Sequence, residues 1–303
     1  MLKNPWIFIV ILLFSCSVGG DLEDCRAKLP NQDTPQDNPV VVNIEMVWVP
    51  GGDFKLGKEL GTAGYGDTTP VSDVTLTGFH IGKYPVTQEQ YKAVMGTNPS
   101  YFTVANGRSP ASGETDTKRP VEDVSWYDAI EFCNKLSDIK GLTPYYNINK
   151  IKKDPNNLNE YDNIKWLITK NTSASGYRLP TEAQWEYTAK GGTPGNFTYA
   201  GSDTVDDVAW YDNNSDSQTH EVGRKAQNGL GIYDMSGNVW EWCWDWYGTY
   251  TGGTDPTGAP SGTKRVLRGG YWSNYTGNIR SVYRSGHYPY GRIFAIGFRV
   301  SLP

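Results

Sequence analysis

The sequence predicts an α+β fold with short strands, few helices and much irregular backbone. Glycine and proline are abundant, with 34 and 18 among 303 residues, and both favour turns over long regular elements. The apolar runs are short and bounded by turn-forming residues, as in short strands. Strands are predicted at residues 46–49, 74–76, 79–81 and 298–300.

Three helices are predicted from their N-terminal capping residues. Thr87, Ser125 and Thr181 are each followed three residues later by Gln or Asp, the spacing of a capping box. After each cap, apolar residues recur three or four positions apart, as on one face of a helix. The pair Gly191-Gly192 should end the third helix. Residues 139–175 contain a dense polar stretch and are interpreted as an insertion.

The composition excludes several classes of protein. With 38% hydrophobic, 13% aromatic and 20% charged residues, the chain resembles neither a disordered protein nor a polytopic membrane protein. The formal net charge of −5 gives no electrostatic footprint for nucleic acid, so no nucleic-acid partner is expected. No P-loop, dinucleotide fingerprint or nucleophile elbow occurs, and the three histidines are scattered without metal-ligand spacing.

Residues 1–15 have the features of an export signal. The apolar run at 6–14 follows a lysine and is too short to span a bilayer. It ends in Leu13-Phe14-Ser15-Cys16, which resembles a bacterial lipoprotein signal, so Cys16 is expected to carry the lipid anchor. The alternative is an ordinary secretory signal with an incidental cysteine. Because Ser17 rather than Asp follows, the resemblance favours the outer membrane and display at the cell surface.

Residues 16–42 are rich in Asp, Pro, Gln, Asn and Gly, and are predicted to be a flexible tether. The folded domain is therefore expected at residues 43–303. Export makes disulfides possible, and the candidate pair in the folded part is Cys133 and Cys243. Both lie in apolar segments, so the sequence leaves open whether they form a disulfide or remain two buried thiols.

Seven motifs in a fixed order carry a family resemblance. They are MVWVPGGDF at 46–54, YPVT at 84–87, PV at 120–121 with VSWYDA at 124–129, RLPTEAQWE at 178–186, GIYDMSGNVWEW at 231–242, RGG at 268–270 and IGFR at 296–299. In this order they resemble the formylglycine-generating enzyme (sulfatase-modifying factor) family over residues 43–303. The resemblance implies a variant of the C-type lectin fold, in agreement with the short strands.

The activity of that family is not expected here. Its enzymes oxidise a substrate cysteine with copper and two cysteines of their own, which lie between the Arg-Gly-Gly and Gly-Phe-Arg motifs. Residues 271–296 contain no cysteine, so neither a soft copper ligand nor a thiolate nucleophile is available. No catalytic residue and no required cofactor are assigned. Glu182 and Glu186, four residues apart, are interpreted as a solvated or cap-supporting face rather than a catalytic pair.

The resemblance also implies a structural calcium site in the motif at 231–242. The side chains of Asp234 and Glu241 and the carbonyls of Gly237 and Val239 would supply the hard oxygen ligands that Ca²⁺ prefers. Alternatively, Glu241 is a buried acid satisfied within the core between two tryptophans. The sugar-binding tripeptides of calcium-dependent lectins, Glu-Pro-Asn and Gln-Pro-Asp, are absent, so the fold alone does not predict sugar binding.

The C-terminal residues, from about 268 to 303, have an unusual composition. After Lys264 there is no Lys, Asp, Glu, Gln, Met or Cys. Framework Arg and Gly residues of the family remain, whereas the positions that are Asn-rich in the family carry mixed residues here, Asn274 among them. Every residue at these positions is encoded by a codon that is reachable from AAC or AAT by changing only adenines. This pattern resembles the target of a diversity-generating retroelement, as in the variable lipoproteins of treponemes.

We call residues 268–303 the predicted variable region. It has the composition of an adaptable binding surface, with Tyr, Ser, Gly and Asn and a few large apolar residues. We therefore predict a surface lipoprotein that binds an unknown protein or cell-surface ligand non-covalently. The candidate ligand-binding positions are Tyr271, Ser273, Asn274, Tyr275, Ser285, Gly286, His287, Tyr288, Tyr290, Ile293, Phe294 and Ala295. Trp272 is expected in the core, and the Arg and Gly residues between these positions should hold the backbone.

Two alternative functions remain open. The chain could be a cysteine-less family member with a different enzymatic activity, which would require a metal or redox centre. It could also be a structural or motility-associated envelope lipoprotein with one fixed partner. The second alternative predicts the same residues at the twelve candidate positions in every cell.

Overall fold

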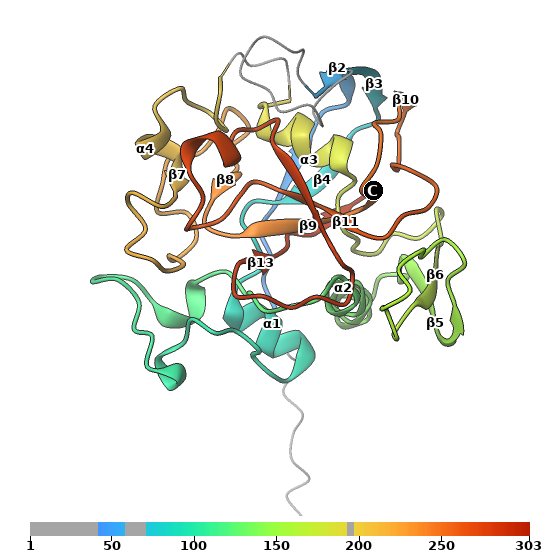
Figure 1. The fold of residues 1–303 in the computed structure, drawn as a ribbon, viewed down its shortest axis with the longest axis horizontal. Coiled ribbons are helices and arrows are strands. Elements are labelled where there is room, and N and C mark those ends of the chain that lie inside the picture. Colours follow the sequence, from blue (N-terminus) through green and yellow to red (C-terminus); the bar gives the residue numbers. More distant parts are fainter. Residues whose placement is uncertain (1–41, 58–70, 193–196) are drawn as a thin grey trace, which may run out of the picture. The chain divides into compact units, whose positions relative to one another are not determined.

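The computed structural model describes residues 42–57, 71–192 and 197–303 (Figure 1). These residues belong to one unit, Val40–Pro303. The export signal, the expected lipidation site Cys16 and the tether up to residue 41 lie outside the described residues. Within the described ranges, no helix has the length and apolar character needed to cross a membrane.

The helices begin where the capping residues predict. The described α-helices are α1 (Gln88–Met95), α2 (Trp126–Ile139), α3 (Glu182–Ala189) and the short α4 (Val205–Val208). At Thr87, Ser125 and Thr181, the side chain accepts a hydrogen bond from the third helical N–H, and the third side chain accepts one from the cap N–H. Gly191 and Gly192 follow α3 with positive φ angles of 87° and 78°. All three predicted helices are therefore confirmed.

A four-stranded sheet lies at the centre of the unit and carries the variable region. Its order is β12 (Arg284–His287), β11 (Arg265–Arg268), β9 (Trp240–Trp246) and β13 (Ile296–Gly297). β11 runs antiparallel to β9 and β12, and β13 runs parallel to β9. Figure 1 shows α3 on one side of β9 and α2 on the other. Six of the seven residues of β9 are buried because both faces of the strand are covered.

The remaining strands form smaller sheets. One contains β1 (Met46–Val49), β4 (Phe79–Gly82) and β14 (Ser301–Leu302); another contains β10 (Gly253–Thr254), β3 (Ser72–Leu76) and β2 (Gly52–Leu56). Two-stranded pairs join β5 (Tyr146–Lys153) to β6 (Trp166–Lys170) and β7 (Ala209–Trp210) to β8 (Ser236–Gly237). The first three predicted strands are confirmed at β1, β3 and β4.

The predicted strand at 298–300 is wrong. This segment links β13 to β14 and has no ladder of its own. The carbonyl of Phe298 accepts a hydrogen bond from Val86 N at 2.9 Å, and that of Val300 accepts one from Gly82 N at 2.8 Å. The segment is therefore extended and buried, but its hydrogen bonds go to the last residue of β4 and to the connection that follows it.

Residues 139–175, interpreted as an insertion, form the β5–β6 hairpin and a polar loop. Inside this loop, the Asp162 carboxylate accepts hydrogen bonds from Tyr127 Oη at 2.8 Å and from Asn157 Nδ2 at 2.7 Å. Because Tyr127 belongs to α2, the loop is fastened to the core through buried polar groups.

The cysteines of the folded part are free thiols. Cys133 and Cys243 are both buried and unpaired, and they lie in different core clusters, around α2 and α3 respectively. Burial raises the pKa of both thiols, which keeps them protonated and unreactive. The question that the sequence left open is therefore settled in favour of two thiols.

Candidate ligand-binding surface

The variable region forms two loops around strand β12. The first loop, after β11, contains the short helical turn η5 (Thr276–Asn278), and the second connects β12 to β13. Figure 1 shows the first loop beside β7 and β8 and the second between α2 and β13. The backbone of the second loop is fixed to the start of α2, since Pro289 O accepts from Trp126 N and Ile293 O accepts from Asp123 N.

Arg268 holds the backbone of the first loop from inside the core. Its guanidinium donates to the carbonyls of Ser281, Val282 and Tyr283 at 3.0, 3.0 and 2.5 Å. The same guanidinium forms an ion pair with Glu186 on α3. Arg268 and Glu186 are both fully buried. The prediction that framework arginines hold the variable backbone is confirmed for this residue.

Arg284 fixes the start of β12 in the same way. Its Nε and Nη2 atoms donate to the two carboxylate oxygens of Glu182 at 2.8 and 2.5 Å, and Nη1 donates to Gly248 O at 2.7 Å. Burial alone would lower the pKa of Arg284, but the Glu182 carboxylate raises it above its ordinary value.

The interpretation of Glu182 and Glu186 as a solvated face is therefore wrong. Both carboxylates are buried, at 3% and 0% exposure, and each is paired with an arginine of the variable region. The α-helical spacing was recognised, but the face carrying these residues points into the core. Such a pair is structural, since both carboxylates are already fully engaged.

Arg299 pairs with the glutamate of the expected calcium site. Its guanidinium donates to both carboxylate oxygens of Glu241 at 2.7 Å, and Trp185 Nε1 donates to the same carboxylate at 2.8 Å. Asp234 is also buried, and its carboxylate accepts from Gly223 N at 2.7 Å. A cation would have to displace the guanidinium from Glu241. The expected set of Asp234, Glu241, Gly237 and Val239 thus does not fit Ca²⁺, and the alternative of a buried, satisfied acid is correct.

One part of the binding surface is an aromatic cluster around Phe294, which is 46% exposed. The Phe294 ring lies 6.1 Å from that of Trp272 and 5.3 Å from that of Tyr101. Phe102 packs edge-on against Trp272 at 5.4 Å. Trp272 was expected in the core, but it is only half-buried and belongs to this cluster.

Tyr101 is a surface residue that the sequence reasoning missed. It is 37% exposed, and the Arg108 guanidinium lies 4.8 Å from its ring centre. The buried Glu122 carboxylate holds this segment by accepting from the N–H groups of Tyr101 and Phe102 at 3.1 and 2.9 Å. Burial raises the pKa of Glu122 to about 7. The only local signal was the adjacent aromatic pair Tyr101-Phe102, outside the predicted helices and strands. Residues outside 268–303 therefore also contribute to the surface.

The second part of the surface surrounds Tyr288, which is 38% exposed. The Tyr288 ring stacks on Tyr290 with centres 5.7 Å apart, and the Lys264 ammonium lies 5.4 Å from its centre. His287 packs against Tyr288 at 5.9 Å, and burial lowers the pKa of the imidazole. This part is therefore aromatic, with a single lysine supplying positive charge near neutral pH.

Other candidate positions are less exposed and pack against the core. Tyr271, Tyr290 and Ile293 are half-buried and pack against the same core cluster as Trp240 and Trp242. Ser273 and Ser285 are half-buried as well. Among the twelve candidate positions, Tyr275 is the most exposed, at 71%. Asn274 closes the adjacent turn, since its Oδ1 accepts a hydrogen bond from Tyr271 N at 3.1 Å.

Two candidate positions do not suit a ligand-contacting role. Ala295 is only 3% exposed and belongs to the core cluster around α2. A Cβ atom at Gly286 would lie within 3.0 Å of Cβ, Cγ and Cδ2 of Tyr247, so a larger residue there requires that ring to move. The structure therefore corrects these two assignments, and the surface depends on its aromatic members.

A sulfatase-modifying factor enzyme 1-like domain matches residues 31–302. The chain belongs to this family. A formylglycine-generating enzyme of Thermomonospora curvata is 31% identical, over 88% of this chain and 96% of the enzyme. The "Chaperone protein LppX" of Paenibacillus barcinonensis is 47% identical, over 76% of this chain and 79% of its own. The predicted family and fold class are thus confirmed.

A solved structure carries the resemblance further. Treponema denticola variable protein 1 has a TM-score of 0.76 and 38% identity, and the match covers 86% of this chain and 97% of that one. The expected similarity to treponemal variable proteins is therefore confirmed at the level of sequence and fold.

Proposed function

We propose that this chain is a lipid-anchored surface protein that binds a macromolecular ligand through its variable region. The observation that carries the proposal is the exposure of Tyr275, Tyr288 and Phe294 on a segment whose backbone is held by buried arginines. Aromatic side chains on a rigid frame bury large areas at low entropic cost, as in protein-binding surfaces.

Recognition without catalysis is the second part of the proposal. Residues 271–296 contain no cysteine, and the thiols of Cys133 and Cys243 are buried and protonated. No group of three or more His, Cys, Asp or Glu side chains suited to a metal ion occurs within the described ranges. These observations favour non-covalent binding over the oxidation of a substrate cysteine.

Diversification and location complete the proposal. The similarity to Treponema denticola variable protein 1 and the adenine-reachable residues of the variable region support variation by a diversity-generating retroelement. The segment Leu13-Phe14-Ser15-Cys16 supports a lipid anchor at Cys16, and Ser17 after it supports the outer membrane and display at the cell surface. The ligand is a protein or other cell-surface molecule, and neither nucleic acid nor a calcium ion is required.

Site-specific photo-crosslinking on intact cells tests the binding role while the ligand is still unidentified. p-Benzoyl-phenylalanine replaces Tyr275 or Phe294, and Tyr161, which is 81% exposed and outside the variable region, serves as the matched control. We expect a discrete crosslinked partner from the two surface positions and none from Tyr161. No crosslink at either surface position, or the same products at all three, would contradict a binding surface here.

A further inference from the structure

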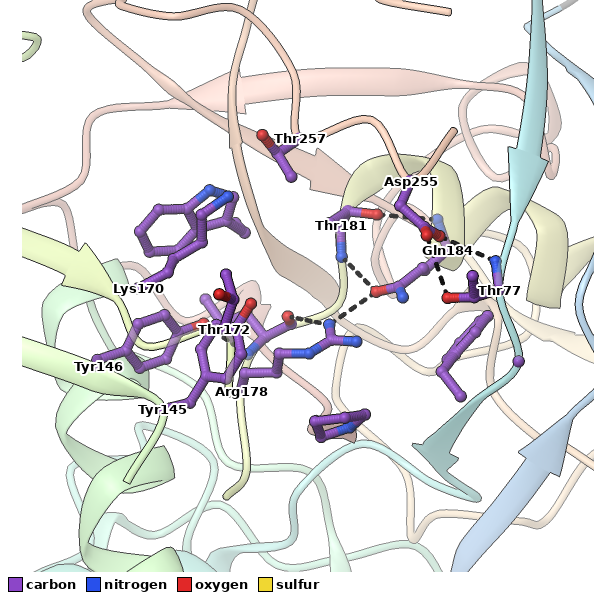
Figure 2. Close-up of a pocket in the computed structure, with 15 residues that line it drawn as sticks. Thr77, Tyr145, Tyr146, Lys170, Thr172, Arg178, Thr181, Gln184, Asp255 and Thr257 are labelled. Atoms are coloured by element: carbon purple, nitrogen blue, oxygen red, sulfur yellow. Dashed lines mark hydrogen bonds between the residues drawn. The ribbon is translucent and has the colours of Figure 1, made fainter. Parts of the chain in front are cut away.

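A cavity of about 500 Å³ with a mixed polar and aromatic lining lies away from the proposed binding surface, between the β5–β6 hairpin and the start of α3. Figure 2 shows Lys170, Tyr145 and Tyr146 on one side of it and Asp255, Thr77 and Gln184 on the other. None of the twelve candidate positions of the variable region lines this cavity. It is therefore a separate feature, which the proposed function does not use.

Two cations in the cavity wall lack an anionic partner. The Arg178 guanidinium is buried, and its Nη1 donates to three neutral acceptors: Gln184 Oε1 at 2.7 Å, Ser301 Oγ at 2.9 Å and Leu179 O at 3.3 Å. Lys170 is half-buried, and its ammonium lies 5.5 Å from the ring centre of Trp244. Within the described part of the chain, no carboxylate forms an ion pair with either residue.

Asp255, a carboxylate of the lining, forms no ion pair with either cation. Asp255 accepts from Thr77 N at 2.9 Å and from Thr77 Oγ1 at 3.1 Å, which fixes the loop that contains it. Burial lowers the pKa of both Lys170 and Arg178, and the carboxylates of Asp245 and Asp255 oppose this only in part, as expected for cations removed from water without a direct ion-pair partner. Charged groups in such surroundings are stabilised by a bound anion with which they can form hydrogen bonds.

The rest of the wall limits the kind of anion. Trp244 stacks on Tyr146 with ring centres 5.2 Å apart, and Tyr145 adds a third aromatic ring. Thr172, Thr181 and Thr257 place hydroxyl groups at the cavity. A cavity of this volume accepts a small organic molecule, and its wall offers charge, aromatic faces and hydroxyl partners together.

We infer that this cavity binds a small hydroxylated carboxylic acid of about the size of an acidic monosaccharide. Its carboxylate pairs with Lys170 and Arg178, its ring or carbon chain lies against Trp244 and Tyr145, and its hydroxyl groups bond to the threonines. Calcium has no part in this binding mode, so the absent sugar-binding tripeptides are not required.

Calorimetric titration of the purified full-length protein with glucuronate and with glucose tests the inference. We expect saturable binding of glucuronate and at least tenfold weaker binding of glucose, a difference of about 1.4 kcal/mol. Lys170→Gln should weaken glucuronate binding at least tenfold. Lys152→Gln, at an exposed position of β5, should leave the dissociation constant unchanged, and thermal unfolding checks that both variants fold.

Three results would overturn the inference: no saturable binding of glucuronate at millimolar concentration, equal binding of glucose, or glucuronate binding that Lys170→Gln leaves unchanged. Because the variable region does not line the cavity, crosslinking at Tyr275 or Phe294 is unaffected by any of these results. The two proposals can therefore fail separately.

Discussion

Replacing Arg268 by methionine tests whether buried arginines hold the variable region. The substitution leaves the carbonyls of residues 281–283 without their donors and removes the ion pair of the fully buried Glu186. Removing one partner of a buried ion pair costs about 3 to 5 kcal/mol of unfolding free energy. Glu186 still accepts from Lys190 at 2.6 Å and from Gly57 N at 2.8 Å, so we expect the lower part of this range.

Urea and thermal unfolding followed by circular dichroism measure this loss. For a domain of this size, about 3 kcal/mol corresponds to a fall in Tm of roughly 6 °C. The matched control is Arg292→Met, because Arg292 also pairs with a carboxylate, that of Asp128, but is 49% exposed. The control should lose at most about 1 kcal/mol. Equal and small losses for the two variants would refute the structural role of Arg268.

Four further predictions concern pH, thiol reactivity, packing and calcium. Burial raises the pKa of Asp245 to about 7. Between pH 4 and 7 the unfolded chain therefore loses this proton while the folded chain keeps it, and the free energy of unfolding falls as pH rises. Asp245→Asn removes this loss, so its free energy of unfolding relative to that of the parent should increase by at least about 1 kcal/mol from pH 5 to pH 8. Cys133 and Cys243 should react with a thiol reagent only after unfolding, because both are buried. Ala295→Tyr should lose about 1 to 3 kcal/mol through overpacking, whereas Tyr275→Ala should change stability by less than about 0.5 kcal/mol. Chelation of calcium should leave Tm unchanged, because the glutamate of the expected site pairs with an arginine.

Each of these predictions has a clear contradicting result. The free energy of unfolding of Asp245→Asn relative to the parent should grow from pH 5 to 8. If it does not, the pKa of Asp245 is not raised. Rapid labelling of Cys133 or Cys243 under native conditions, located by peptide mapping, would show that this thiol is accessible. Equal tolerance of Ala295→Tyr and Tyr275→Ala would place Ala295 outside the core, and a lower Tm after chelation would restore the calcium site.

The parts of the fold that sequence predicted correctly depend on local interactions. A capping box needs only residues three positions apart, so Thr87, Ser125 and Thr181 marked the helix starts correctly. The strand at 46–49 was visible because apolar residues lie between clear turn signals. By contrast, residues 298–300 have the composition of a strand, but their hydrogen-bond partners are Gly82 at the end of β4 and Val86 after it, more than two hundred residues away, and no local pattern reports that.

The site was predicted in part for the same reason. Composition, together with the resemblance to the Asn-rich positions of the family, marked Tyr275, Tyr288 and Phe294, which the structure exposes. Glu182 and Glu186 looked like an exposed pair because their arginine partners lie about a hundred and about eighty residues further along the chain. Tyr101 was missed because its place beside Phe294 results from the tertiary fold.

The central claim is that this surface is diversified for binding, and sequencing tests it most directly. The measurement is deep sequencing of the segment encoding residues 268–303, with its flanking DNA, across related cells. The account predicts variation concentrated at residues 273–275, 285, 287–288 and 293–294, constant codons for Arg268, Arg284 and Arg299, and a nearby template copy bearing adenines at the varied positions. A uniform segment without a template would contradict diversification and favour a single fixed partner in the envelope.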